Sequence, residues 1–329
     1  MKKFGGLIFT VAAASFVHEA NASDLAVCPA GCQHATIQSA IDSSQPGDVI
    51  HIAAGTYFEN LLVPNKRLTF VGAGEDFTAI DGRNRGTVLT LGTPTGGTPQ
   101  MVSIIGVTIT HGSATNGGGI LVNNVALDLQ NSIVSSNVAA NNGGGIDVGT
   151  FTVPAKITRS MIVHNRAGNL GGGVAVEAEC VAQIVDSNVD RNTAGVRGGG
   201  LHGEGASHTS IQGTTIANNT SRQDGGGLYI EEGEPRATLT FTTGSLVGNE
   251  ATRAGGGLFD AGGRSVLSST VVARNNAGTD GGGIHGGGSG LKNTFVVQNT
   301  AGGQGGGIFG ANPPAGNTVA DNAPNDVAP

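Results

Sequence analysis

Three glutamates recur at one position of a repeated motif, six residues after the first glycine of a Gly-Gly-Gly triplet. They are Glu177, Glu204 and Glu231. If the repeats stack, these carboxylates lie about 4.8 Å apart. Carboxylates so close raise one another's pKa, turn apart into solvent, or hold a cation such as Ca²⁺. The three glutamates are therefore candidate catalytic acids, and a Ca²⁺ ion could be held among them.

More polar side chains occur two positions before these glutamates. They are Asp147, His202 and Tyr229, and Ala175 interrupts the series. His202 joins the glutamates as a candidate acid–base group. The same residues could instead contact a carbohydrate, or simply form a solvated acidic stripe along one face. The candidate binding set is Asp147, Glu177, His202, Glu204, Tyr229 and Glu231.

A repeat that occurs eight times must position these side chains. The glycine triplets begin at Gly117, Gly143, Gly171, Gly198, Gly225, Gly255, Gly281 and Gly305, at intervals of 24 to 30 residues. A period of this size is typical of a solenoid. An aliphatic residue follows each triplet. Apolar residues also stand nine and fourteen residues before the triplet, except in the first repeat, which has Thr108 and Ser103 at these positions. Each coil thus supplies three short apolar segments, one for each face of a prism.

An asparagine precedes each triplet by six residues in all but the first repeat, which has His111. These are Asn137, Asn165, Asn192, Asn219, Asn249, Asn275 and Asn299. Asn tolerates the left-handed conformation, and stacked amides can hydrogen-bond from coil to coil. We therefore expect the column to be structural. A small residue, beginning with Ser113, stands four residues before each triplet and should fit a tight corner.

The first 22 residues resemble a signal peptide. Lys2 and Lys3 precede a short apolar run, and Ala20-Asn21-Ala22 fits a cleavage site. The layout looks bacterial and predicts a secreted or cell-surface protein. No later apolar run is long enough to span a bilayer.

Cysteine usage fits an oxidising compartment. Cys28 and Cys32 should form a small disulfide loop, although a redox or metal pair is the alternative. Cys180 is left over and should be buried as a small apolar residue.

The mature chain should be a single β-helix domain over residues 23–329. Residues 23–100 would form the cap and first coils, 101–322 the regular coils, and 323–329 a tail. Residues 36–42 predict a short amphipathic helix with Thr36 as its N-cap. Such a helix would cover the unpaired end of the first coil.

The stretches "TIQSAID", "PGDVIHIAAGTYFENL" and "LTFVGAG" resemble the first coils of the pectin-lyase-like superfamily. The later Asn and Gly-Gly-Gly repeats are similar to those of polymorphic outer membrane proteins. The resemblance implies an all-β fold: a single-stranded right-handed parallel β-helix of about ten coils. Lyases, hydrolases, esterases and adhesins share this scaffold, so the resemblance alone does not choose an activity.

Composition and motifs narrow the function. The net charge is −7 without a basic cluster, which disfavours nucleic acid and anionic membranes as partners. There is no Asp-Asp pair like that of polygalacturonases, and no Trp for the Arg-Pro-Trp motif of pectin methylesterases. The arginines near the triplets, such as Arg197 and Arg253, are expected in turns away from the glutamate column.

The sequence favours a secreted binding or adhesion protein that is directed to a polysaccharide or cell-surface glycan. The alternative is a Ca²⁺-dependent polysaccharide lyase, or another glycan-cleaving enzyme, that uses the glutamate face with His202 or Tyr229. A third interpretation is a structural spacer. The sequence leaves the glycan and the oligomeric state open.

Overall fold

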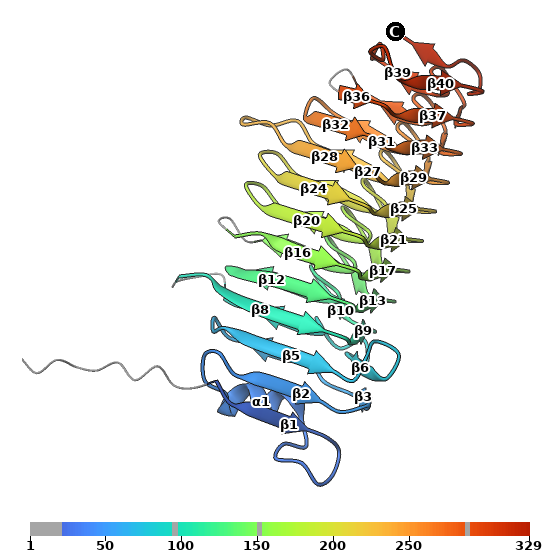
Figure 1. Cartoon of the computed structure of the whole chain (residues 1–329). Coiled ribbons are helices and arrows are strands. Elements are labelled where there is room, and N and C mark those ends of the chain that lie inside the picture. Colours follow the sequence, from blue (N-terminus) through green and yellow to red (C-terminus); the bar gives the residue numbers. More distant parts are fainter. Residues whose placement is uncertain (1–21, 94–97, 150–152, 287–289) are drawn as a thin grey trace, which may run out of the picture.

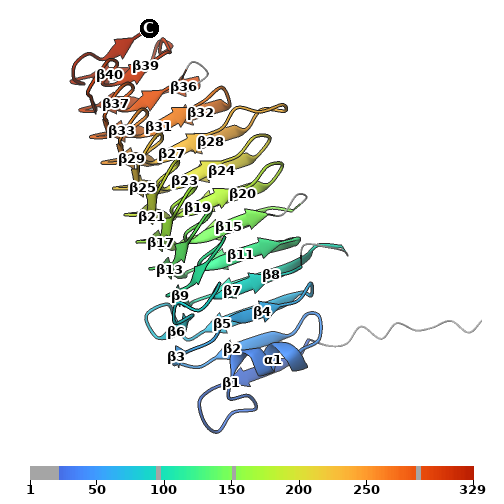
Figure 2. The ribbon, with the colours of Figure 1, turned by 180° about the vertical axis from the view of Figure 1, so that it is seen from behind.

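The chain winds into a parallel β-helix, as the computed structural model shows for residues 22–93, 98–149, 153–286 and 290–329. Each coil adds one strand to each of three long sheets, and every strand pairs in parallel with its counterpart in the next coil. Figures 1 and 2 show the stack from two sides. The predicted all-β fold is confirmed, with eleven strands in each long sheet where about ten coils were expected.

The three long sheets are named A, B and C. Sheet A contains β1 (Asp24–Val27), β2 (Val49–Ile52), β5 (Leu68–Gly72), β8 (Gln100–Ile105), β12 (Val125–Gln130), β16 (Ala155–Thr158), β20 (Val181–Val185), β24 (His208–Gln212), β28 (Thr238–Thr242), β32 (Arg264–Ser268) and β36 (Gly290–Lys292). Sheet B contains β3 (Gly55–Tyr57), β6 (Thr78–Asp81), β9 (Thr108–Thr110), β13 (Ile133–Ser135), β17 (Met161–Val163), β21 (Asn188–Asp190), β25 (Thr215–Ala217), β29 (Ser245–Val247), β33 (Val271–Ala273), β37 (Phe295–Val297) and β40 (Thr318–Ala320). Sheet C contains β4 (Leu61–Val63), β7 (Leu89–Leu91), β11 (Ile120–Asn123), β15 (Ile146–Gly149), β19 (Val174–Val176), β23 (Leu201–Gly203), β27 (Leu228–Ile230), β31 (Leu258–Asp260), β35 (Ile284–His285), β39 (Ile308–Phe309) and β41 (Val327–Ala328).

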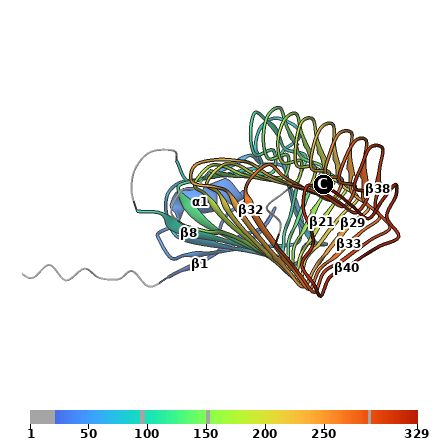
Figure 3. The same cartoon turned by 90° about the horizontal axis from the view of Figure 1, so that it is seen from above.

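A fourth, narrow sheet, named D, was not expected from the sequence. It contains β10 (Ser113–Ala114), β14 (Val138–Ala139), β18 (Arg166–Ala167), β22 (Thr193–Ala194), β26 (Thr220–Ser221), β30 (Glu250–Ala251), β34 (Asn276–Ala277) and β38 (Thr300–Ala301). Each of its strands has two residues, too few to produce a visible periodic pattern. The loop after each sheet D strand projects from the prism, as the view along the axis shows (Figure 3).

The first regular coil differs from the sequence alignment by one residue. Ile104 and Ile109, not Ser103 and Thr108, pair with the aliphatic residues of the next coil. Gly112, not His111, occupies the asparagine position, since its N–H donates to Asn137 Oδ1. The corner residue is likewise Ala114, not Ser113. The reason is that this coil has one residue fewer between sheet D and its glycine triplet.

The interior of the prism is filled by columns of aliphatic side chains. Leu201, Leu228 and Leu258 on sheet C are fully buried, as are Ile211 and Phe241 on sheet A. Each such side chain stabilises the fold by roughly 1.5–3 kcal/mol. Contact between coils is close at the triplet: a Cβ atom on Gly200 would lie 2.7 Å from the carbonyl oxygen of Gly227.

The asparagine column forms a continuous ladder inside the prism. From Asn137 onward, each Nδ2 donates to the Oδ1 of the next asparagine at 2.9–3.1 Å, and the ladder ends at Asn322. Each backbone N–H donates to the same Oδ1. The second Nδ2 proton reaches a main-chain carbonyl, for example from Asn219 to Val189. The ladder therefore satisfies buried polar groups at every coil boundary.

The helix α1 (Ile37–Ser43) covers the first coil. Thr36 caps it by accepting a hydrogen bond from the N–H of Ser39, and Ile37, Ala40 and Ile41 are buried. A disulfide joins Cys28 to Cys32 beside this cap, and Cys180 is free and buried. The predicted signal peptide falls on residues outside the described part, except Ala22. Within the described ranges, no helix is long and apolar enough to cross a membrane.

Replacing Asn219 with Ala should lower the free energy of unfolding by roughly 1–3 kcal/mol, because buried N–H and C=O groups on both neighbouring coils lose their partners. Asn219 itself has no exposed surface. Chemical denaturation monitored by circular dichroism would measure the loss. Gln212→Ala, at an exposed position on sheet A, is the control and should change stability by less than about 0.5 kcal/mol. An Asn219 variant as stable as this control would contradict a structural role.

Candidate functional site

The outer face of sheet C lies between two walls and is hollowed over its later coils; we call this face the sheet C groove. One wall is made by the loops between sheet D and the glycine triplets, and the other by the residues that follow the sheet C strands. The first glycine of a triplet makes the turn between wall and floor: Gly225 has φ +67°, and a Cβ atom there would lie 2.8 Å from Tyr229 Cβ. A side chain at this position would therefore collide with the floor of the groove.

The floor of the groove is the outward column of sheet C. Asp147, Ala175, His202 and Tyr229 occupy matching positions on consecutive strands. Asp147, His202 and Tyr229 are only 1–3 % exposed, because the loops before the triplets cover them. The structure thus contradicts a freely solvated stripe at these positions.

The floor continues as a stack of rings that the sequence analysis did not identify. His202, Tyr229, Phe259, His285 and Phe309 lie nearly parallel, with consecutive centroids 4.4–5.2 Å apart. All five stand four residues after the first glycine of a triplet, so the repeat alignment contained the signal. The faces of the inner rings are covered by one another, and only their edges are available to a ligand.

A carboxyl cluster occupies the groove before this ring stack. Glu177 is hydrogen-bonded to Asp147 on the preceding coil and to Glu204 on the following coil. Asn142 Nδ2 also donates to Glu177 Oε1 at 3.2 Å, across the groove. Two carboxyl groups can hydrogen-bond only if they share a proton, so the cluster retains protons that isolated carboxylates would lose.

The pKa values of the cluster are displaced upward. Burial, with a contribution from the charge of Glu204, raises the pKa of Asp147 to about 6. The hydrogen bond to Glu177, followed by burial, raises the pKa of Glu204 to about 7. Burial also raises the pKa of Glu177. Burial is common to all three groups, and the neighbouring carboxyls add to it, which accounts for the common direction.

Glu231 is in line with the other glutamates, yet its environment differs. Its Oε1 is 3.2 Å from Arg197 Nη1, which reaches over from the opposite wall. The guanidinium carbon lies 4.8 Å from the ring centroid of Tyr229. The expectation that Arg197 would lie away from the glutamate column was therefore wrong, because the loop before the triplet folds back over sheet C. Burial raises the pKa of Glu231, and Arg197 opposes that rise.

Two candidate acid–base groups are held in fixed protonation states. Burial lowers the pKa of His202 to about 3, so its imidazole is neutral, and its Nε2 has no hydrogen-bond partner among the described residues. Burial raises the pKa of Tyr229 to about 12, so its hydroxyl keeps its proton. His202 is also stacked on Tyr229 and covered, which keeps it from direct contact with a large substrate.

The groove is open beyond Arg197, where a pocket of about 510 Å³ is lined by residues of four consecutive coils. Its polar groups differ in their availability. Asp260 accepts hydrogen bonds from the N–H groups of Gly262 and Ser265, whereas His285 Nδ1 and Arg197 Nε are buried without a side-chain partner among the described residues. The pocket is lined by Arg197, Asp224, Tyr229, Arg253, Phe259, Asp260, Ala261, Gly262, His285 and Gly286.

The carboxylates do not assemble a recognisable metal centre. Within the part of the chain that the structure describes, no three His, Cys, Asp or Glu side chains are arranged to hold a metal ion. Glu177 is engaged with Asp147 and Glu204, and Glu231 with Arg197. The Ca²⁺ prediction gains no support from these positions.

No protein-family profile matches the chain, and no curated protein matches it. Among solved structures, pectin methylesterase PemA from Erwinia chrysanthemi is similar, with a TM-score of 0.41 and 13% identity over 77% of this chain and 80% of that one. A pectin methylesterase in complex with hexasaccharide VII has a TM-score of 0.37 and 12% identity, with the same coverage. ORF18 of Geobacillus virus E2 has a TM-score of 0.35 and 14% identity, over 78% of this chain and 55% of that one. Likeness at this level carries no argument about activity.

The carboxyl cluster predicts a pH-dependent stability difference between the wild type and Glu204→Gln. Because the folded pKa values of Asp147 and Glu204 are raised, their contribution to stability is complete at about pH 4 and is lost as the pH rises past about 7. The variant keeps a neutral group there at every pH. Thermal unfolding should therefore show the wild type losing stability relative to the variant between these pH values.

The comparison with the variant is needed because neutral, buried His202 acts in the opposite direction over the same range. Glu232→Gln, at an exposed position on the next coil, is the matched control. Its stability difference from the wild type should be independent of pH. A flat difference for Glu204→Gln as well would show that the cluster does not share protons.

Proposed function

We propose that this protein is a secreted polysaccharide-binding β-helix whose binding surface is the open part of the sheet C groove. The observation that carries the proposal is the pocket of about 510 Å³ that is lined by residues of four consecutive coils, with an aromatic floor and polar groups on both walls. Concave sites with apolar floors and a few fixed polar groups are typical of ligand binding.

The available groups suit a chain of hydroxylated sugars. The side chain of Arg253 is 63 % exposed, and its Nη1 lies 3.8 Å from Asp224 Oδ2. This ion pair is too long for a hydrogen bond, so the N–H groups of Arg253 can donate to a ligand. The Arg197 side chain, which is 35 % exposed, lines the same pocket. The faces of Tyr229 and Phe259 are stacked on neighbouring rings, so a sugar cannot stack on them. The sugar would instead contact the ring edges and form hydrogen bonds with the polar side chains of the walls. Two arginines would also attract acidic substituents.

Export and adhesion belong to the same proposal. The signal-peptide pattern of residues 1–22 supports passage across a membrane, and the Cys28–Cys32 disulfide suits an oxidising compartment. A rod-shaped scaffold that repeats along its axis can present an extended surface to a linear polymer. We therefore place the protein outside the cell or at its surface, where it would adhere to a glycan.

The groove assignment predicts that Arg253→Gln weakens oligosaccharide binding about tenfold, the effect of losing one charged hydrogen bond. A glycan array would select the oligosaccharide, and isothermal titration calorimetry would measure its affinity. Arg274→Gln, at an exposed arginine on the sheet B side, is the control. Equal affinities for the two variants would show that the groove does not bind the oligosaccharide. If the protein binds no glycan at all, the spacer interpretation is favoured.

The carboxyl cluster favours a second candidate function, a glycan-cleaving enzyme. A carboxyl group with a pKa of about 7, such as that of Glu204, could act as a general acid near neutral pH. Glu177 and Asp147, whose pKa values are also raised, could return a proton to Glu204 after it has donated its own.

Incubating the protein with uronate polysaccharides, with and without Ca²⁺, separates the two functions. The binding proposal predicts no release of unsaturated or reducing ends. Turnover that Glu204→Gln abolishes, while Glu232→Gln preserves it, would establish the enzyme instead.

A further inference from the structure

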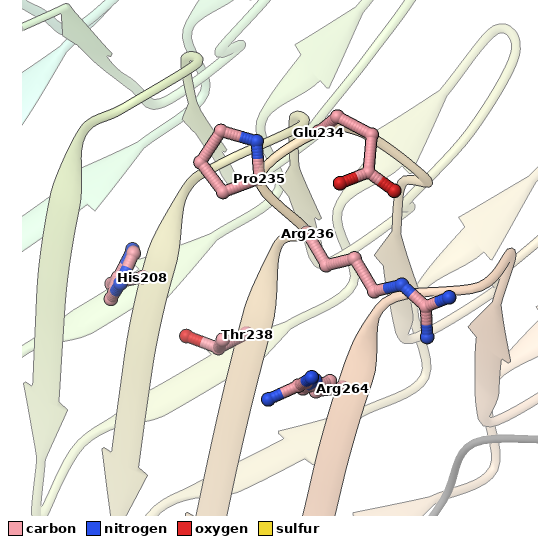
Figure 4. Close-up of a pocket in the computed structure, with 6 residues that line it drawn as sticks. All are labelled: His208, Glu234, Pro235, Arg236, Thr238 and Arg264. Atoms are coloured by element: carbon pink, nitrogen blue, oxygen red, sulfur yellow. The ribbon is translucent and has the colours of Figure 1, made fainter.

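A second hollow lies on the outer face of sheet A, away from the sheet C groove, and we call it the corner pocket. Its volume is about 280 Å³. Figure 4 shows His208 on one side, the turn of Glu234 and Pro235 along another, and Arg264 opposite that turn. Arg236 and Thr238 complete the lining. The lining residues come from β24, β28 and β32 and from the loop that leads from sheet C into β28.

The charge of the corner pocket is opposite to that of the whole chain. It contains two guanidinium groups against the single carboxylate of Glu234, whereas the chain has a net charge of −7. Arg236 and Arg264 are both exposed, and neither side chain has a hydrogen-bond or ion-pair partner among the described residues. Two free guanidinium groups at one hollow are suited to a single anionic group, which each can hold with two parallel hydrogen bonds.

A neutral hollow of about 200 Å³ adjoins the corner pocket, and the two share His208 and Thr238. Its lining offers the hydroxyl and amide groups of Gln183, Ser210 and Thr240, together with Val181, Ala182 and Thr209, whose hydroxyl is buried. Hydroxyl and amide side chains both donate and accept hydrogen bonds, as the hydroxyls of a sugar do.

His208 can add an acceptor at the boundary of the two hollows. Its Nδ1 is 2.9 Å from the carbonyl oxygen of Ala206, a contact that requires the proton on Nδ1. In the neutral ring, Nε2 is then free to accept a hydrogen bond from a ligand hydroxyl. A ligand that spans both hollows would therefore carry an anionic group at one end and hydroxyls at the other.

We propose that the corner pocket and its neutral neighbour form a second carbohydrate site, which binds an acidic sugar residue. Arg236 and Arg264 hold the carboxylate or sulfate group. Thr238, His208 and the hydroxyl-lined hollow hold the ring hydroxyls. The site is separate from the sheet C groove, because Glu231 lies in the groove and Arg236, five residues later, has already reached the opposite side of the corner.

Calorimetry with a uronate trisaccharide and its uncharged methyl ester tests the proposal. The acid should bind more tightly than the ester, and its affinity should fall as salt is added. The double variant Arg236→Gln, Arg264→Gln should weaken acid binding at this site by at least tenfold. Both positions are exposed, so the thermal unfolding midpoint should not change. Lys156→Gln, on the same sheet face in β16, is the control and should bind normally.

Each remaining outcome has a definite meaning. Equal binding of acid and ester, or unchanged binding by the double variant, would overturn the site. If inorganic sulfate bound as tightly as the trisaccharide, the proposal that the site recognises a sugar would be wrong, and only an oxyanion site would remain. A sulfated trisaccharide that outcompetes the uronate would support the site and identify a sulfate ester as the preferred group. Arg253→Gln reports on the groove alone, so failure of the groove and failure of the corner pocket are distinguishable.

Discussion

Each coil of this protein must lie directly on the coil before it, and close backbone contact at the glycine triplets enforces that stacking. A Cβ atom on Gly200 would approach the carbonyl oxygen of Gly227 too closely, so the coils could not stay at strand spacing with a larger residue there. The asparagine ladder adds side-chain hydrogen bonds at the same boundary. Together the glycine contacts and the asparagine ladder fix the register of the coils, and this register determines where every outward side chain lies.

The same stacking explains the chemistry of the sheet C groove. Residues at equivalent positions of successive coils are brought to strand spacing whether their side chains attract or repel. Rings at this spacing stack, as Tyr229 does on His202 and Phe259. Carboxyl groups at the same spacing raise one another's pKa, as Glu177 does that of Glu204. The groove thus changes along its length from an acidic section, where Glu177 and Glu204 follow the sheet C strands, to an aromatic section on the strands themselves.

The corner between sheets C and A separates two surfaces of different character. On the groove side, Glu231 is neutralised by Arg197. On the other side, Arg236 and Arg264 form no ion pair with any described residue, and the neighbouring hollow is lined by hydroxyl and amide groups. A loop of a few residues connects the two, so a polysaccharide on one surface and an acidic sugar on the other could be bound by the same coils.

The sequence alone determined the coil, because its period, its three apolar columns and its asparagine column all depend on local spacing. It placed Glu177, Glu204 and Glu231 in line, and the same spacing already contained Phe259, His285 and Phe309. It could not determine the two-residue strands of sheet D, or the register of the first coil, where one missing residue shifts Gly112 into the place expected for His111. Only the tertiary structure decided which face of sheet C is covered, since the loop carrying Arg197 folds back over it through contacts between coils. The loops before the triplets likewise cover His202 and Asp147 in their own coils, and burial is the main cause of their shifted pKa values.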